Sequence, residues 1–360
     1  MKKTLIAAAL LSGFAATAQA QSNVTLYGIV DAGFMNSKND GQKSRNGIDS
    51  GIAGGSRWGI RGTEDLGNGL KANFQLESGI NIDDGTTGQS NGTTARLFGR
   101  TAWVGLSSAS MGEVRLGRQD SFGFNWFGGA INPFGNAYQQ AQSQTVFGFN
   151  NTGGTGDRLD NTALYMSPVF SGFQLGVGYS FNSAGQESAV ASNAQRTDTP
   201  VITTGLRYTS GPLAVVLTYD QKKAADSAAA NASSDIKNLQ VGATYDFGVV
   251  KAHAGYGRLQ NYAFRSSTEK ENAYLVGLTV PFGASSIFGT YQRNDNRNAN
   301  LGRQDKAISG FAVGYNYKLS KRTLAYAIVS QYSDAVAYTG GSAGQNGDRR
   351  ELGFGIQHKF

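Results

Sequence analysis

The chain has 360 residues, a formal net charge of +7, 16% charged residues, 11% aromatic residues and 50 glycines. This aromatic content argues against disorder, and only 5 prolines exclude a collagen-like or proline-rich chain. There is no cysteine, which excludes disulfides, thiolate metal sites and a cysteine nucleophile. The 2 histidines, His253 and His358, are far apart in sequence and argue against an imidazole metal cluster. We therefore expect neither a metal nor a cofactor.

The N-terminus has the pattern of an export signal. Lys2 and Lys3 precede a short apolar stretch over 5–11, and Ala18-Gln19-Ala20 has the small-x-small form of a cleavage site. We expect residues 1–20 to be a removed signal peptide and residues 21–360 to form one domain. Loss of the two lysines lowers the formal net charge from +7 to +5. No later stretch has the ~20 apolar residues of a membrane-spanning helix.

From Val24 onward, apolar and polar residues alternate in short segments, as expected of β-strands with one apolar face. The first segment is 24–31, and a long polar loop is expected over 37–55. Sixteen such segments can be counted to the C-terminus, and the clearest are 24–31, 56–62, 70–77, 96–106, 112–118, 173–181, 213–220, 239–247 and 352–360. The pattern predicts an all-β protein.

The links between these segments fall into two classes that alternate along the chain. Links such as 63–69, 107–112 and 246–248 are tight turns, whereas links such as 81–94 and 119–157 are long and polar. Short turns at one rim, long loops at the other and an even strand number are typical of a transmembrane β-barrel, whose closure leaves no unpaired backbone in lipid. A soluble β-sandwich also alternates, but one core does not easily use sixteen strands of this length.

The longest link, 119–157, carries no charged residue between Asp120 and Asp157 and is rich in glycine, amide and aromatic residues. So long a link in a compact domain usually serves a function, such as a lid or a binding loop. Its aromatic residues fit packing of the link against the barrel wall better than a track for a solute. Asp120 and Asp157 fit either anchors of the link or ordinary turn residues.

Several motifs resemble the general-diffusion porins of Gram-negative β-proteobacteria along the whole mature chain. They are V-T-L-Y-G-I-V-D at 24–31, S-R-W-G-I-R-G-T-E-D-L-G-N-G-L-K-A at 56–72, G-E-V-R-L-G-R-Q at 112–119, Y-K-L-S-K-R-T at 317–323 and the terminal Phe360. The resemblance implies a 16-stranded antiparallel transmembrane β-barrel in the outer membrane, assembled as a homotrimer. Its third long loop folds inward and narrows the pore, and its terminal aromatic residue is an assembly signal. The likeness is greatest to anion-selective members, and it places Arg57, Arg100 and Arg158 on an arginine ladder of the constriction.

Inward-facing arginines suit an anion pathway, since arginine stays ionised and low-dielectric walls focus its field. Strand parity places Arg57, Arg61, Arg96 and Arg100 on the inward face, whereas Arg118 falls on the outward face unless a bulge shifts it. Together with Arg158 and Asp120, the four inward arginines are the candidate constriction residues. The alternative is that some of these arginines form structural ion pairs with Glu64, Glu77 or Asp120.

We therefore predict a water-filled channel for small hydrophilic solutes and ions, with a preference for anions, surrounded by outer-membrane lipid. A substrate-specific porin or a surface-binding, adhesin-like barrel is the alternative. No Ser/His/Asp set can be brought together, so we predict no enzyme and no catalytic residue. The lysines and arginines are interspersed with acids along the chain, which argues against nucleic-acid binding.

Overall fold

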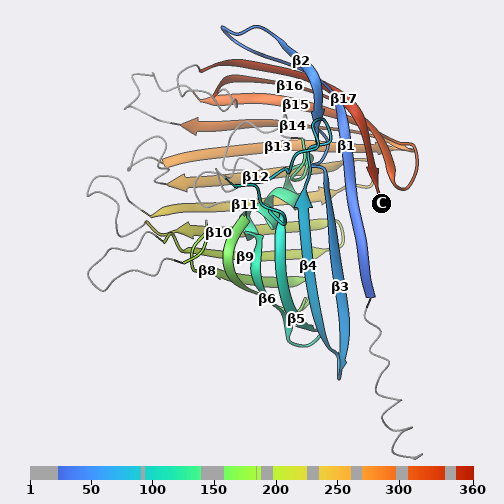
Figure 1. The fold of residues 1–360 in the computed structure, drawn as a ribbon. Helices are drawn as coiled ribbons and strands as arrows, with labels where there is room; N and C mark the ends of the chain where they lie inside the picture. The colour runs from blue at the N-terminus through green and yellow to red at the C-terminus, as the bar shows by residue number, and fades with distance from the viewer. Residues whose placement is uncertain are drawn as a thin grey trace, which may run out of the picture.

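The computed structural model describes residues 23–90, 94–138, 158–183, 185–187, 198–224, 235–260, 270–296, 307–336 and 346–360. These residues form one antiparallel sheet and one short helical stretch (Figure 1). The strands are β1 (Asn23–Asn39), β2 (Arg45–Ser50), β3 (Arg57–Gly67), β4 (Leu70–Gly79), β5 (Thr101–Ser108), β6 (Gly112–Asp120), β7 (Arg158–Met166), β8 (Phe173–Ser180), β9 (Val201–Ser210), β10 (Leu213–Lys222), β11 (Ile236–Asp246), β12 (Lys251–Gln260), β13 (Lys270–Phe282), β14 (Ser285–Asn296), β15 (Ile308–Lys318), β16 (Thr323–Val336) and β17 (Asn346–Lys359). The helical stretch is the π-helix η1 (Gly123–Gly128) followed by the single turn α2 (Gly129–Ile131).

The sheet closes on itself because its first and last strands pair. β1 pairs with β17 from Ile29↔Lys359 to Asn39↔Arg349. The other edge of β1 pairs with β3 over 23–29 and with β2 over 32–37, so β2 and β3 are two halves of one barrel strand. The 17 strands therefore make a barrel of sixteen, and the predicted fold class is confirmed.

The alternating residues face lipid and lumen as the barrel interpretation requires. On β11, Val241 and Tyr245 are about two-fifths exposed, whereas the residues just before them, Gln240 and Thr244, are buried. The same arrangement, apolar outward and polar inward, recurs on β8, β14 and β17. A soluble β-sandwich would bury its apolar face, so this pattern rules that alternative out and fits a wall whose outer surface faces hydrocarbon.

Several strand boundaries differ from the predicted ones. The region 37–55, expected to be a loop, contains the end of β1 and all of β2. The predicted start of the strand 96–106 is wrong. β5 begins at Thr101, so Arg96 and Arg100 both lie before the strand. β3 continues through most of the predicted turn 63–69. The link 119–157 agrees closely, since β6 ends at Asp120 and β7 begins at Arg158.

Candidate functional site

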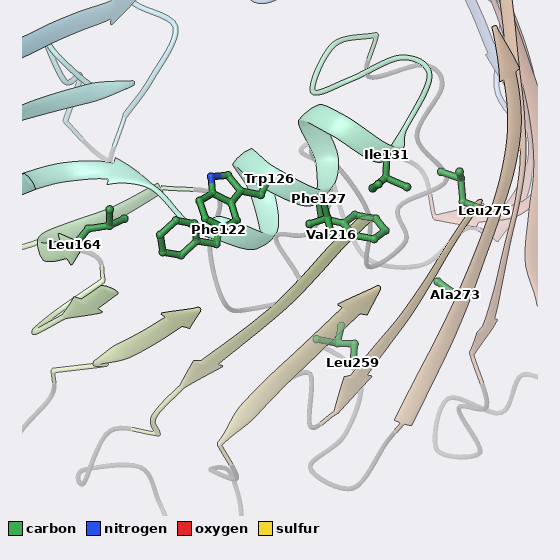
Figure 2. Packing of buried hydrophobic residues seen from close by; sticks show 9 residues of the cluster. All are labelled: Phe122, Trp126, Phe127, Ile131, Leu164, Val216, Leu259, Ala273 and Leu275. Atoms are coloured by element: carbon green, nitrogen blue, oxygen red, sulfur yellow. The ribbon is translucent and has the colours of Figure 1, made fainter. Parts of the chain in front are cut away.

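The described part of the longest link, residues 121–138, packs against the inner wall of the barrel, and we call it the inward segment. Its apolar residues Phe122, Trp126, Phe127 and Ile131 form one buried cluster with wall residues, which are Leu164, Val216, Leu259, Ala273 and Leu275. Figure 2 shows these side chains between the short helix and the strands. Packing of the aromatic residues against the wall is thus what the structure shows for this part of the link.

The inward segment approaches the wall closely because the wall beneath it carries glycine. A Cβ added to Gly242 would lie 2.6 Å from Ile131 Cγ2, and one added to Gly205 would lie 2.7 Å from Trp126 Cε3. Carbon atoms normally meet at about 3.5–4.0 Å, so a larger residue at either position would hold the segment away from the wall.

Hydrogen bonds attach the inward segment along its length. The Phe122 backbone N–H donates to Thr203 Oγ1 at 2.8 Å, and the Tyr138 hydroxyl donates to Asn316 Oδ1 at 2.6 Å. His253 Nδ1 lies 2.9 Å from the carbonyl oxygen of Ile131. Burial, with a smaller contribution from the charge of Asp31, raises the pKa of Tyr138, so its hydroxyl remains a donor at any ordinary pH.

Opposite the inward segment, three predicted constriction arginines line one cavity of about 230 Å³. Arg57, Arg100 and Arg158 lie on its wall, and Phe122, Asn125 and Trp126 of the inward segment also line it. We call this the arginine cavity. The sequence-predicted arginines and the predicted facing link are thus brought together.

Two carboxylates hold these arginines in place. Arg100 Nε lies 2.6 Å and Arg57 Nη1 3.9 Å from the same Glu77 oxygen, whose partner oxygen accepts a 2.9 Å hydrogen bond from the Tyr27 hydroxyl. Arg158 Nε lies 3.3 Å from Asp120 Oδ1. The ion pairs that the sequence offered as the alternative are therefore present, and the pore-lining role of these arginines stays a prediction.

The balance of charge in the arginine cavity is positive despite these pairs. Its charged lining consists of four arginines and two carboxylates, so the formal charge is +2; the four arginines are Arg57, Arg100, Arg115 and Arg158. Arg115 stacks over the Trp103 ring with its guanidinium carbon 4.2 Å from the ring centroid. The alternation of the segment 112–118 also places Arg115 on the inward face, and this was the signal that could have identified it from the sequence.

The other two predicted arginines lie elsewhere. Arg61 lines a separate cavity of about 470 Å³ towards the short-turn rim, which shares Gln75, Trp103 and Arg115 with the arginine cavity. Arg96 does not line either cavity; its Nη1 lies 2.8 Å from Asp160 Oδ1, as part of an ion-paired group at the opposite rim.

Arg118 belongs to the same ion-paired group. Its Nη1 lies 2.5 Å from Asp160 Oδ1, and its Nε donates to the Gly99 carbonyl at 2.9 Å. A register shift does occur between Gly117 and Gln119, but the side chain of Arg118 is not among those lining the arginine cavity. Through Asp160, this ion-paired group joins the strands at the two ends of the longest link, β6 and β7, to the segment before β5 that contains Arg96 and Gly99.

The described residues contain no group of three metal-ligating side chains and no helix of sufficient length and apolarity to cross a membrane. A closed barrel with an apolar exterior and a narrowed, charged interior defines a membrane channel of the β-barrel class.

Comparison with known proteins identifies the family. A family model described as Gram-negative porin matches residues 7–357. The chain is 40% identical to an outer membrane porin protein of Bordetella pertussis, with 100% of both chains covered, and 35% identical to outer membrane porin protein 32 of Delftia acidovorans, with 91% of this chain and 88% of that one covered. Among solved structures it is similar to the anion-selective porin from Comamonas acidovorans, with a TM-score of 0.74, 30% identity, and coverage of 94% of this chain and 100% of that one.

The chain belongs to the Gram-negative porin family, which confirms the resemblance in its motifs. It is an outer-membrane protein that forms a channel for the diffusion of small hydrophilic solutes.

Proposed function

We propose that this porin prefers anions and that Arg57, Arg100 and Arg158 set the preference where they face the inward segment. The observation that carries the proposal is the arginine cavity, in which four guanidiniums meet two carboxylates. The similar porin from Comamonas acidovorans, described as anion-selective, gives independent support.

The strength of the attraction between an anion and these arginines depends on the width of the passage. An anion ~4 Å from one guanidinium gains up to ~4 kcal/mol at an effective dielectric constant of 20, and much less with water between them. Charges in a wide vestibule are screened over ~8 Å at physiological salt, whereas those in a constriction are screened much less. Each arginine thus contributes a partly screened charge, and we expect graded rather than all-or-none losses on neutralisation.

The test is the reversal potential across a tenfold KCl gradient, where a pore permeable to one ion alone would reach about 59 mV. The wild type is expected to favour chloride, and the triple variant Arg57→Gln, Arg100→Gln, Arg158→Gln to lose most of that preference. The matched control is Lys318→Gln, Lys321→Gln, Arg322→Gln, which removes the same charge from exposed residues at a short turn. A wild type that favours potassium, or equal effects of both triple variants, would contradict the proposal.

A substrate-specific porin is the alternative, and one relative, 26% identical, is named a monosaccharide porin. Flux that rises linearly with solute concentration would support general diffusion, whereas saturation would support a specific site. We propose general diffusion, because the arginine cavity shares Gln75, Trp103 and Arg115 with the larger cavity towards the short-turn rim.

Further proposals concern assembly. We propose that residues 1–20 are removed as a signal peptide and that Phe360 acts in assembly. We propose also that Asp120 anchors the inward segment through its ion pair with Arg158. The assembled porin is proposed to be a homotrimer, and we propose no catalytic activity for it. A solved porin from Vibrio cholerae that shares the fold is described as a trimer form. Chemical cross-linking in outer membranes tests the trimer; cross-linking that stops at the dimer would contradict it.

A further inference from the structure

The six residues between β2 and β3, residues 51–56, turn inward and lie on the inner face of the barrel. Ile52 and Ala53 are buried, in a cluster that includes Met35 of β1 and Ile328 of β16. A Cβ added to Gly33, on the inward face of β1, would meet Ile52 Cδ1 at 3.0 Å. A single barrel strand is therefore interrupted by a second inward element, which we call the inner strap.

The inner strap meets both parts of the candidate constriction. Its residues Ile52 and Ala53 share their buried cluster with Phe134 and Tyr138 of the inward segment. On the other side, a Cβ added to Gly55 would lie 3.3 Å from Arg100 Nη1, and one added to Gly54 would lie 3.9 Å from Arg57 Nη2. The strap thus lies between the inward segment and the arginines of the opposite wall.

A buried carboxylate fastens the inner strap. Asp31 of β1 is 1% exposed and accepts hydrogen bonds from the Tyr326 hydroxyl at 2.7 Å, Gln357 Nε2 at 2.9 Å and the Ala53 backbone N–H at 3.4 Å. At the two ends of the strap, the Gly51 N–H and the Ser56 hydroxyl donate to the Asp31 carbonyl at 2.8 and 3.0 Å. No lysine or arginine within the described residues forms an ion pair with this carboxylate. These hydrogen-bond donors are all neutral, and through them the carboxylate joins the strap to β16 and β17.

We propose that the inner strap is a second constriction element, which narrows the pore beside Arg57 and Arg100. Asp31 is the residue that positions the strap, and it does not itself contact the ion. The effect on ion preference rests on the proposed function above, whereas the effect on pore width does not. A detached strap would widen the passage beside the arginines, so more water and salt would screen their charge.

The experiment compares two substitutions that remove the same charge. Asp31→Asn keeps an acceptor for the Tyr326 hydroxyl and the Ala53 N–H, and the Gln357 amide can turn to accept from the new amide. Asp31→Ala removes the three bonds to the carboxylate but keeps the two bonds from the strap to the Asp31 backbone carbonyl. The Ala53 N–H of the strap then has no acceptor in the seated position, which shifts the ratio of seated to detached strap by roughly tenfold.

We expect Asp31→Ala to raise single-channel conductance in concentrated KCl, to admit larger polymers and to move the reversal potential towards zero. Asp31→Asn should keep the wild-type conductance and polymer cutoff. If Asp31 acted only as a charge, both variants would shift equally and towards stronger chloride preference. Equal behaviour of the two variants in conductance would overturn the inference, even if the wild type proved to be anion-selective.

A second variant approaches the same contact from the lumen side. Gly55→Val leaves Asp31 intact but fills the space beside the Arg100 guanidinium. We expect a narrower polymer cutoff and an altered reversal potential in a barrel of normal heat-modifiability. The control Gly47→Ala lies on β2, where the nearest atoms belong to the flexible end of Arg45 at 3.4 Å. Wild-type conductance and selectivity in Gly55→Val would overturn the placement of the strap at the constriction, including the case in which Asp31→Ala does not fold.

Discussion

Replacing Gly242 by leucine should release the inward segment from the wall. Gly242 lies on the inner face of β11, and an added Cβ would be 2.6 Å from Ile131 Cγ2 and 2.9 Å from Phe127 Cε2. Carbon atoms in contact lie about 3.5–4.0 Å apart, so the Cβ alone is about 1 Å too close. Leucine adds three further carbons in the same direction, and the helix cannot stay where it is.

The energetic consequence follows from the two side chains that would move. Ile131 and Phe127 are both fully buried, and burial of each contributes about 1.5–3 kcal/mol, so together about 3–6 kcal/mol. The contact between His253 and the Ile131 carbonyl contributes about 1 kcal/mol more. The barrel itself keeps its strand pairing, because Gly242 pairs through its backbone with Val216 and Gly255. We therefore expect the segment to detach in a barrel that remains folded.

The measurements are single-channel conductance, the polymer cutoff and the reversal potential in a KCl gradient. Gly242→Leu should raise the conductance and the cutoff and lower the ion preference, since the passage beside the arginines widens. The control is Ala243→Leu, the next residue on the same strand, which faces outward. A folded Gly242→Leu barrel with the conductance of Ala243→Leu would refute the reasoning, because it would mean that the segment does not limit the pore.

Three further predictions concern assembly and orientation. Phe360 closes the barrel seam through reciprocal backbone hydrogen bonds with Gly28, at 3.1 and 3.2 Å. If the ring is the assembly signal, Phe360→Ala and deletion of Phe360 should both lower the yield of heat-modifiable oligomer. A normal yield from Phe360→Ala with a low yield from the deletion would assign the defect to the lost backbone bonds. Epitope tags within 222–236 or 334–348 should be accessible on intact cells, and accessibility of tags at 63–69 or 246–248 alone would invert the topology. N-terminal sequencing of outer-membrane material should begin at Gln21, and an N-terminus at Met1 would contradict removal of the leader.

The barrel could be predicted from the sequence because each of its determinants is local. Alternation of period two places Gln240 and Thr244 on one face and Val241 and Tyr245 on the other, whatever the rest of the chain does. Link lengths alternate because consecutive antiparallel strands end at opposite rims. The pairing of Ile29 with Lys359 that closes the barrel is long-range. It could still be expected, because an open sheet would expose unpaired backbone groups to lipid, so the first and last strands must pair.

The interior could not be predicted to the same depth because it depends on tertiary contacts. Parity gave the same weight to Arg96 as to Arg100, but the strand begins only at Thr101, and Asp160 rather than Glu77 pairs with Arg96. The inner strap lay within a region interpreted as a polar loop. Its signal was two apolar residues followed by two glycines, which is ambiguous without knowledge of the wall that they contact.

The large number of glycines has a physical role beyond turns. Six of them lie on the inner faces of six different strands, where an added Cβ would meet the inward segment; they are Gly176, Gly205, Gly242, Gly255, Gly277 and Gly314. Side chains at these positions would fill the space that the segment occupies. The wall of β3 to β6 instead carries large charged residues, such as Glu77 and Arg115, on its inward face. The same alternation that builds the barrel therefore also divides its interior, because small inward residues let the inward segment pack against one side of the wall, while the arginine cavity lies on the other side.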